Sequence, residues 1–294
     1  MTEELRSQAK ELLKNKQVEL VIGYQRAADN VSAKPCFIEQ EKDTDLLIWD
    51  AYCVYNLSNY LKEYTGRKVA IVAKVCDIKS IAVLLQENQL KRQDLFIIGV
   101  ECCGAVDEKK SSFNAAQIRE IGFAQKCKSC LPLSIQLYDH FIKDKKEERR
   151  KPDEDYDKYE PIRKMEAKAL SERFKFWQEE FRRCIRCYAC RQICPMCYCP
   201  KCVADQTQPS WFSKGGNLEG NFSWNVTRAM HLASRCIDCG ECERACPAGI
   251  PLREINKKIE KDIKELFSYE AGASLEQKPF FACFDKSDPE DWIK

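Results

Sequence analysis

The sequence predicts an α/β domain with a mainly parallel sheet, followed by a charged helical linker and a smaller α+β domain that is rich in cysteine. In the first half, short apolar runs alternate with stretches of helical periodicity, which favours helices covering a parallel sheet. In the second half, 11 of the 19 cysteines lie within residues 184–246. A chain of 294 residues is long enough for about two such domains.

The elements of the first domain, expected over residues 1–142, follow the hydrophobic spacing. Residues 2–16 carry apolar side chains at helical intervals and predict an amphipathic helix. We expect the next elements at residues 18–24 (strand), 46–49 (apolar run), 54–64 (helix), 69–74 (strand), 78–86 (helix), 95–100 (strand) and 115–121 (helix).

A run of charge separates the two halves. In residues 143–160, 15 of 18 side chains are charged, which predicts an exposed connector. Apolar residues at helical spacing then predict a helix over residues 163–183. We therefore expect a linker and helix at 143–183, a cysteine-rich domain at 184–264 and a tail at 265–294.

The overall charge argues against two classes of partner. Lys and Arg number 48 against 46 Asp and Glu, so no strong field draws the protein to nucleic acid or to an anionic membrane. The longest apolar runs are far shorter than the roughly 20 residues of a spanning helix, and the first residues do not resemble a signal segment. We expect a cytoplasmic protein in which cysteine binds metal rather than forming disulfides.

Eight cysteines form two runs with the same spacing: two, two and three residues between successive cysteines and a proline after the fourth. The runs are Cys184, Cys187, Cys190 and Cys194, then Cys236, Cys239, Cys242 and Cys246. This spacing lets three thiolates hold three corners of a cubane cluster, while the fourth ligates the other cluster, as in two-cluster ferredoxins. We predict a dicluster ferredoxin-like domain with two 4Fe-4S clusters. Cluster one has the ligands Cys184, Cys187, Cys190 and Cys246, and cluster two has Cys236, Cys239, Cys242 and Cys194.

The competing interpretation of the runs is a pair of structural zinc sites, because four thiolates also hold tetrahedral zinc. Two identical runs, each closed by proline, favour iron and sulfur. A further three cysteines, Cys197, Cys199 and Cys202, lie between the runs. They could form an additional site for a cluster or a zinc ion with a fourth ligand from elsewhere, or they could pack as free thiols.

The charge beside the two runs differs. Near the first run lie Arg182, Arg183, Arg186 and Arg191, whereas Asp238, Glu241 and Glu243 accompany Arg235 and Arg244 in the second. Positive charge favours a reduced cluster, so this pattern predicts the higher potential for the first run's cluster. The alternative is that these arginines face only water or a partner.

Five cysteines of the first domain follow the ends of predicted strands. They are Cys76 after residues 69–74, Cys102 and Cys103 after residues 95–100, and then Cys127 and Cys130. Because the carboxyl ends of neighbouring parallel strands open onto one crevice, a further cluster could form there on Cys127, Cys130, one of Cys102 and Cys103, and as a fourth candidate Cys76. The alternative is inert buried thiols. No glycine-rich dinucleotide fingerprint occurs, but a flavin (FAD) phosphate could rest on the helix start around residues 77–80.

Residues 72–77 (VAKVCD) and 97–104 (IIGVECCG) resemble the core of the beta-subunit family of deazaflavin-reducing hydrogenases and formate dehydrogenases. The resemblance covers roughly residues 18–135. Together with the double repeat, it implies an iron-sulfur electron-transfer subunit of an intracellular multi-subunit oxidoreductase complex, of a kind typical of anaerobes. Its redox partner subunits would belong to a formate dehydrogenase, a hydrogenase or a heterodisulfide-reductase-like complex.

Two features separate this chain from the flavin-containing members of that family. Here the cluster domain follows the α/β domain, and adjacent Cys102 and Cys103 before Gly104 replace a single cysteine. The Cys-Cys-Gly sequence, with Cys76, Cys127 and Cys130, also resembles the cysteine-rich motif of heterodisulfide reductase catalytic subunits. The alternative is therefore a catalytic subunit that carries flavin or an unusual cluster at this motif, and the sequence leaves open whether the chain is itself an enzyme.

Overall fold

The computed structural model describes residues 1–107, 122–128, 130, 135–144, 156–213, 215–278 and 280–282. Two compact units divide the chain: Met1–Tyr156 with Gly272–Gln277, and Asp157–Ala271 with Lys278–Lys294. The helix expected at residues 115–121, most of the charged linker and Cys283 lie outside the described residues.

A five-stranded sheet forms the centre of the first unit, in the order β2-β1-β3-β4-β5. Its strands are β1 (Leu20–Arg26), β2 (Ala33–Ile38), β3 (Val69–Ala73), β4 (Leu95–Val100) and β5 (His140–Ile142). Neighbouring strands are parallel except for β2, which pairs antiparallel with β1 at one edge. The predicted α/β domain with a mainly parallel sheet is therefore confirmed.

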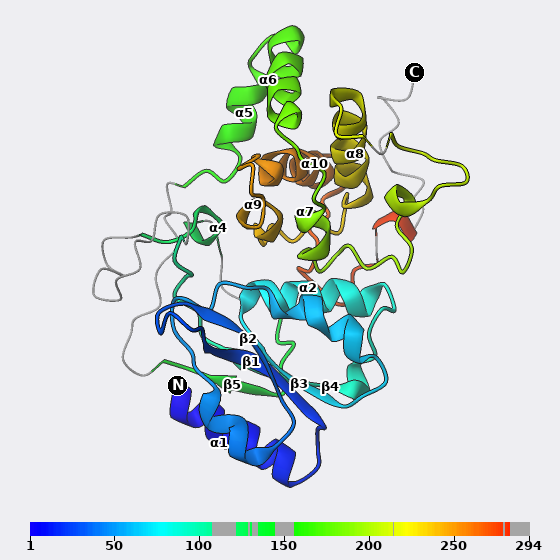
Figure 1. Ribbon diagram of the computed structural model, residues 1–294. Coiled ribbons are helices and arrows are strands. Elements are labelled where there is room, and N and C mark those ends of the chain that lie inside the picture. Colours follow the sequence, from blue (N-terminus) through cyan, green and yellow to red (C-terminus); the bar gives the residue numbers. More distant parts are fainter. Residues whose placement is uncertain are drawn as a thin grey trace. The chain divides into compact units, whose positions relative to one another are not determined.

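The burial of the central strands explains why the sheet was visible in the sequence. Every residue of β3 is buried, and so is nearly all of β4, as expected where helices cover both faces of a parallel sheet. Helix α1 (Thr2–Lys14) packs through Leu5, Ala9 and Leu12. Helix α2 (Val75–Gln86) contacts β3 and β4, and Figure 1 shows α1 and α2 on opposite faces of the sheet.

Several elements differ from the predicted ones. Where a helix was expected at residues 54–64, the structure has a 3-10 helix, η2 (Leu57–Tyr64). A second 3-10 helix, η1 (Glu41–Leu46), leads into the apolar run at residues 46–49. A third 3-10 turn, η3 (Arg92–Asp94), leads into β4, and α2 begins at Val75 instead of residue 78. Strand β2 was not predicted because only Ala33, Cys36 and Ile38 of this edge strand are buried. Strand β5 has three residues, too few to show a hydrophobic pattern.

The regular elements of the second unit, within its described residues, are all helical. They are α5 (Glu160–Glu166), α6 (Leu170–Arg182), α7 (Ala189–Gln192), η5 (Val203–Asp205), α8 (Leu218–His231), α9 (Glu241–Arg244), α10 (Leu252–Phe267) and η6 (Phe280–Ala282). The single helix expected at 163–183 is interrupted at Ala169, whose backbone is extended and whose N–H donates to Glu172 Oε2 at 3.2 Å. Helix α8 packs against α6 and α10, and α7 packs against α9 (Figure 1).

None of the helices within the described residues is both long and apolar enough to cross a membrane. The longest, α10, has 16 residues and carries charged side chains along its length.

Candidate iron-sulfur centres

The two cysteine runs have the same backbone conformation. The residues two and four places after the first cysteine are left-handed in both runs: Arg186 and Tyr188 with φ of 55° and 59°, and Asp238 and Gly240 with φ of 57° and 70°. Each run then enters a one-turn helix, α7 or α9. Alternating right- and left-handed residues direct successive backbone N–H groups to one side, which makes a concave site for an anion. The sequence repeat is thus also a structural repeat, suited to an anionic cluster.

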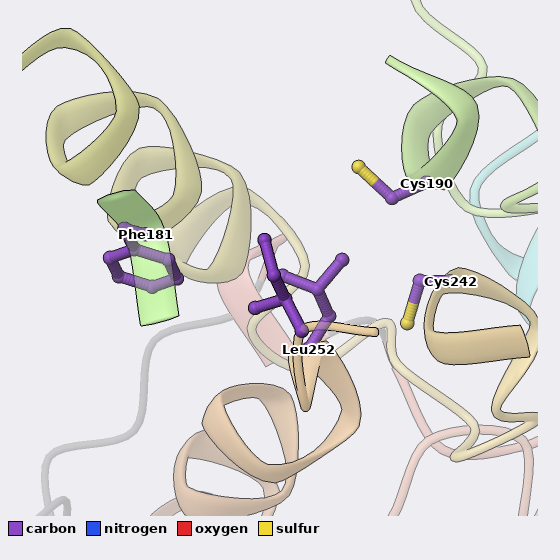
Figure 2. Packing of buried hydrophobic residues seen from close by; sticks show 5 residues of the cluster. Phe181, Cys190, Cys242 and Leu252 are labelled. Carbon is purple, nitrogen blue, oxygen red and sulfur yellow. The ribbon is translucent and has the colours of Figure 1, made fainter. Parts of the chain in front are cut away.

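One pocket of the second unit collects cysteines from both runs. Its walls include Cys184, Cys187 and Cys190 of the first run together with Cys246 of the second, the four predicted ligands of cluster one. The remaining lining is largely apolar and includes Ile250 and Leu252. The same apolar residues pack with Phe181, Cys190 and Cys242, and Figure 2 shows Cys190 on α7 and Cys242 on α9 beside this cluster. A low-dielectric wall of this kind fits an iron-sulfur cluster.

Three predicted ligands of cluster two act on one another. The thiol of Cys194 influences Cys242, which is buried in the core of the unit, and Cys242 in turn influences Cys236. Burial raises the pKa of the Cys242 thiol to about 12, with Arg228 opposing that rise. Asn256 Nδ2 also donates to Cys242 Sγ at 3.8 Å, and Ile250 N donates to Cys246 Sγ at 3.4 Å. Donors to ligand sulfurs are the usual means by which proteins stabilise a reduced cluster.

The three cysteines between the runs have different surroundings. A hydrogen bond from the Cys197 thiol lowers the pKa of Cys194 to about 6, so Cys197 adjoins a predicted ligand of cluster two. Cys202 adjoins Arg191, and Cys199 is exposed. Among the residues that the structure describes, no three Cys, His, Asp or Glu side chains are close enough to hold a single metal ion. A cubane has four separate iron corners and takes its thiolates farther apart than one zinc ion does.

Arg228 of α8 is a charged residue of this site that the sequence pattern did not indicate. Its side chain is buried, and its Nη2 donates to the Cys190 carbonyl at 2.9 Å. Burial alone would lower the pKa of Arg228, but the thiols of Cys194 and Cys242, followed by Cys197 and Cys190, raise it. The sequence feature that could have indicated the burial of Arg228 is its helical spacing, because Asn221, Trp224 and Asn225 share the buried face of α8 with it.

Predicted thiols of the first unit also interact. Cys76, in the first turn of helix α2, interacts with Cys102, which in turn interacts with Cys127 and Cys130. Burial raises the pKa of Cys102 to about 12, against a lowering influence of Lys74. Cys103 is partly exposed, as are Cys76, Cys102 and Cys127. The carboxyl ends of β3 and β4 therefore bring together the cysteines that the sequence placed there.

The backbone after Cys103 explains how Cys127 reaches this group. Gly104 has φ of +122°, and a Cβ atom there would come within 2.6 Å of Phe123, so only glycine fits. Ala105 then exchanges contacts with the segment around helix α4 (Gln125–Lys128): Ala124 N donates to Ala105 O at 2.8 Å, and Ala105 N donates to Cys127 Sγ at 3.3 Å. The glycine of the Cys-Cys-Gly sequence thus has a structural role.

The helix start where a flavin phosphate could have rested is occupied by the chain itself. The carboxylate of Asp77, fully buried, accepts hydrogen bonds from Lys74 N at 3.0 Å and Leu57 N at 2.7 Å. Lys74 Nζ completes the network with Asp77 Oδ2 at 3.0 Å and Tyr24 OH at 2.5 Å. Because an anionic side chain already sits at the amino end of α2, this position does not fit a phosphate.

A separate pocket opens beside Cys102 at the carboxyl end of β4. Its lining includes Val100, Glu101, Tyr138 and Phe141. The pocket lies within the first unit, next to the interacting thiols, and Val75, the first residue of α2, also lines it.

Known proteins resemble this chain in two ways, over the cysteine-rich region alone and over most of its length. The family model described as a 4Fe-4S dicluster domain matches residues 183–251. The F420-dependent formate dehydrogenase subunit beta of Methanocaldococcus jannaschii is 24% identical, with 92% of each chain covered. The F420-dependent formate dehydrogenase 1 subunit beta of Methanococcus maripaludis is 21% identical over 89% of this chain and 88% of its own length. A component of the ion-translocating oxidoreductase complex of Buchnera aphidicola is 34% identical over 71 residues, which are 24% of this chain and 12% of that protein.

These findings define an iron-sulfur protein whose second unit contains a 4Fe-4S dicluster domain at residues 183–251. The whole chain is a homologue of the beta subunits of F420-dependent formate dehydrogenases. The predicted resemblance and the predicted 4Fe-4S clusters are therefore confirmed, whereas the assignment of individual ligands stays a prediction.

Proposed function

We propose that this chain is an iron-sulfur electron-transfer subunit of a multi-subunit oxidoreductase complex, in which it relays single electrons between partner subunits. The observation that carries the proposal is the pocket lined by Cys184, Cys187, Cys190 and Cys246, which draws on both runs of the dicluster domain. The two homologues that span the chain are named as beta subunits of formate dehydrogenase, so a formate dehydrogenase is the partner complex we favour. A cytoplasmic location, expected from the sequence, belongs to the same proposal.

The ligands of the two dicluster cubanes are assigned crosswise. Cys184, Cys187, Cys190 and Cys246 hold cluster one, and Cys236, Cys239, Cys242 and Cys194 hold cluster two. Support comes from the shared pocket and from the influence of Cys194 on Cys242 across the two runs. Each run thereby completes the site of the other, which fixes the distance between the clusters and favours rapid exchange of electrons.

A third cubane is assigned to the first unit, on Cys76, Cys102, Cys127 and Cys130. The support is their mutual interaction at the carboxyl end of β3 and β4 and the hydrogen bond from Ala105 N to Cys127 Sγ. We assign Cys102 as the ligand from this position because it interacts with Cys76, Cys127 and Cys130. This cluster would give electrons an exit or entry point in the first unit.

Iron analysis and a redox titration of the full chain, prepared without oxygen, test the proposal. We expect about twelve irons per chain, about eight of them in the dicluster domain. Cys102→Ser should remove about four irons, and the matched variant Cys103→Ser should remove none. A colourless preparation would contradict the electron-transfer function. Equal losses of iron from both variants would contradict only the ligands assigned to the third cubane.

A second candidate function, catalysis in the first unit, is favoured by the pocket beside Cys102. A flavin or a substrate bound there would lie next to the third cluster and could exchange electrons with it. Release of a flavin on denaturing the iron-loaded protein would support this function. A flavin-free sample that still passes electrons to an added acceptor protein would favour the relay alone.

A further inference from the structure

Arg228 is a permanent cation buried among the thiols of the dicluster domain. Only 4% of its surface is exposed. Its Nη2 donates to the Cys190 carbonyl, while its Nε is buried with no acceptor among the described residues. A buried guanidinium is stable only where negative charge lies close to it.

The negative partners of Arg228 are sulfur atoms. The groups that act on it most strongly are Cys194 and Cys242, followed by Cys197 and Cys190, and no carboxylate is among them. Cys194 and Cys242 are proposed ligands of cluster two, whereas Cys190 is a proposed ligand of cluster one. Arg228 therefore lies where its charge acts on both clusters.

Most other charges beside the two runs are already paired. Arg191 Nη1 contacts Asp205 Oδ2 at 2.8 Å, and Arg253 Nε contacts Asp238 Oδ1 at 2.6 Å. Glu241, fully buried, pairs with Arg244 at 2.8 Å. The excess of arginine near the first run, read from the sequence, is thus partly cancelled in the fold.

Arg186, which also lies among the cluster residues, binds oxygen atoms instead of sulfur. Its guanidinium donates to Gly220 O at 2.7 Å, to Ser213 O at 3.1 Å and to Tyr188 OH at 3.0 Å. These neutral acceptors hold the loop before α8 in place. Arg228 differs because its strongest neighbours are the cluster ligands themselves.

We propose that Arg228 is the shared counter-charge of the two clusters, a positioning residue that raises both reduction potentials. The inference rests on the proposed crosswise ligation. One-electron reduction adds a negative charge to a cluster, and a fixed cation in a low-dielectric site stabilises that charge more strongly the closer it lies. Arg228 is buried and donates to the carbonyl of Cys190, a proposed ligand of cluster one. It also hydrogen-bonds Cys197, whose thiol donates to Cys194, a proposed ligand of cluster two.

The test is a redox titration of the full iron-loaded chain with dithionite, in which electron paramagnetic resonance follows each cluster. Arg228→Gln removes the charge and keeps a donor for the Cys190 carbonyl. We expect it to weaken reduction of both clusters at least tenfold, a fall of about 59 mV for one electron. Arg228→Lys, which keeps the charge, should leave both midpoints close to those of the unaltered protein. Arg191→Met, which removes a charge paired with the half-exposed Asp205, should shift them less.

Unchanged midpoints in Arg228→Gln, or equal shifts in Arg228→Gln and Arg228→Lys, would overturn the inference. If Arg228→Gln and Arg228→Met fail to load iron while Arg228→Lys loads fully, the charge is required and the inference stands. Failure of all three variants would show that only the shape of arginine matters, which overturns it. The unaltered chain serves as a separate check, because the absence of two cubane signals there would reject the proposed function and not the role of Arg228.

Discussion

Each unit of the molecule buries a cation beside cysteine, and the two cations are balanced in different ways. Lys74 in the first unit contacts the Asp77 carboxylate at 3.0 Å and also binds oxygen atoms of Tyr24 and Tyr55. Arg228 in the second unit has thiols as its strongest neighbours. The network around Lys74 is complete without metal, whereas the charge of Arg228 is balanced by groups whose ionisation depends largely on the clusters. The buried charge of Lys74 is thus balanced without metal, whereas that of Arg228 depends on it.

Removal of iron should show the difference between the two units most clearly. Cluster binding contributes directly to the folding of small metal domains, and loss of the thiolates also leaves Arg228 poorly balanced. In chelator-treated protein, hydrogen exchange should show that α8 and α10 lose at least about 3 kcal/mol of protection, while β3 and β4 keep theirs. Equal loss in both units would contradict the account.

Asp77→Asn tests the other side of the comparison. The substitution leaves the buried Lys74 ammonium without its carboxylate, which should lower the free energy of unfolding of the first unit by about 3 kcal/mol or more. Urea unfolding of the iron-loaded protein measures this effect. The matched control is Glu19→Gln, which removes an exposed pair with Arg67 and should cost less than about 1 kcal/mol. A cost for Asp77→Asn as small as that of the control would show that the buried pair does not stabilise the unit.

Cys197→Ala tests whether a thiol that is not a proposed cluster ligand influences cluster two. Its thiol donates a hydrogen bond to Cys194, and loss of a donor to a ligand sulfur disfavours the reduced cluster. We expect the iron content to stay constant and the midpoint of cluster two to fall by less than a tenfold change in the reduction equilibrium, about 59 mV. Cys199→Ala, at an exposed position, should change neither quantity. Loss of iron from Cys197→Ala would instead make Cys197 a ligand.

The smallest effect is expected at Cys36, a buried thiol on β2 away from the proposed clusters. Burial raises the pKa of Cys36 from 9.0 to about 12. Below pH 9 both the folded and the unfolded chain hold the proton. Above pH 9 only the unfolded chain releases it, so stability falls as pH rises towards 12. Between pH 8 and 9.5 the unaltered chain should lose roughly 1 kcal/mol more than Cys36→Ala in urea unfolding. Parallel pH profiles would argue against this contribution.

The parts of the site that local chemistry determines could be read from the sequence. The spacing of Cys184, Cys187 and Cys190 is set by a turn and a short helix within one run, so it is visible without knowledge of the fold. The same holds for β3 and β4, whose continuous burial makes them apolar throughout. Edge strand β2 and the three-residue β5 lack such a signal, because half of β2 faces away from the core and β5 is very short.

Features that depend on distant neighbours could not be read in this way. Arg228 reaches the Cys190 carbonyl across 38 positions of sequence, and nothing in its local surroundings indicates that contact. Asp77 presents a similar case, because its burial depends on Leu57, 20 positions away. The same limit applies to the possible flavin phosphate at the start of α2: the sequence shows a polar helix start but not that its own carboxylate fills it.

The crosswise sharing of ligands is the central claim, and Cys246→Ser tests it most directly. Electron paramagnetic resonance of the reduced, iron-loaded chain should show that Cys246→Ser and Cys187→Ser abolish the same cubane signal, although the two cysteines belong to different runs. Cys239→Ser should abolish the other signal. If Cys246→Ser instead removed the signal that Cys239→Ser removes, each run would hold its own cluster and the account would be contradicted.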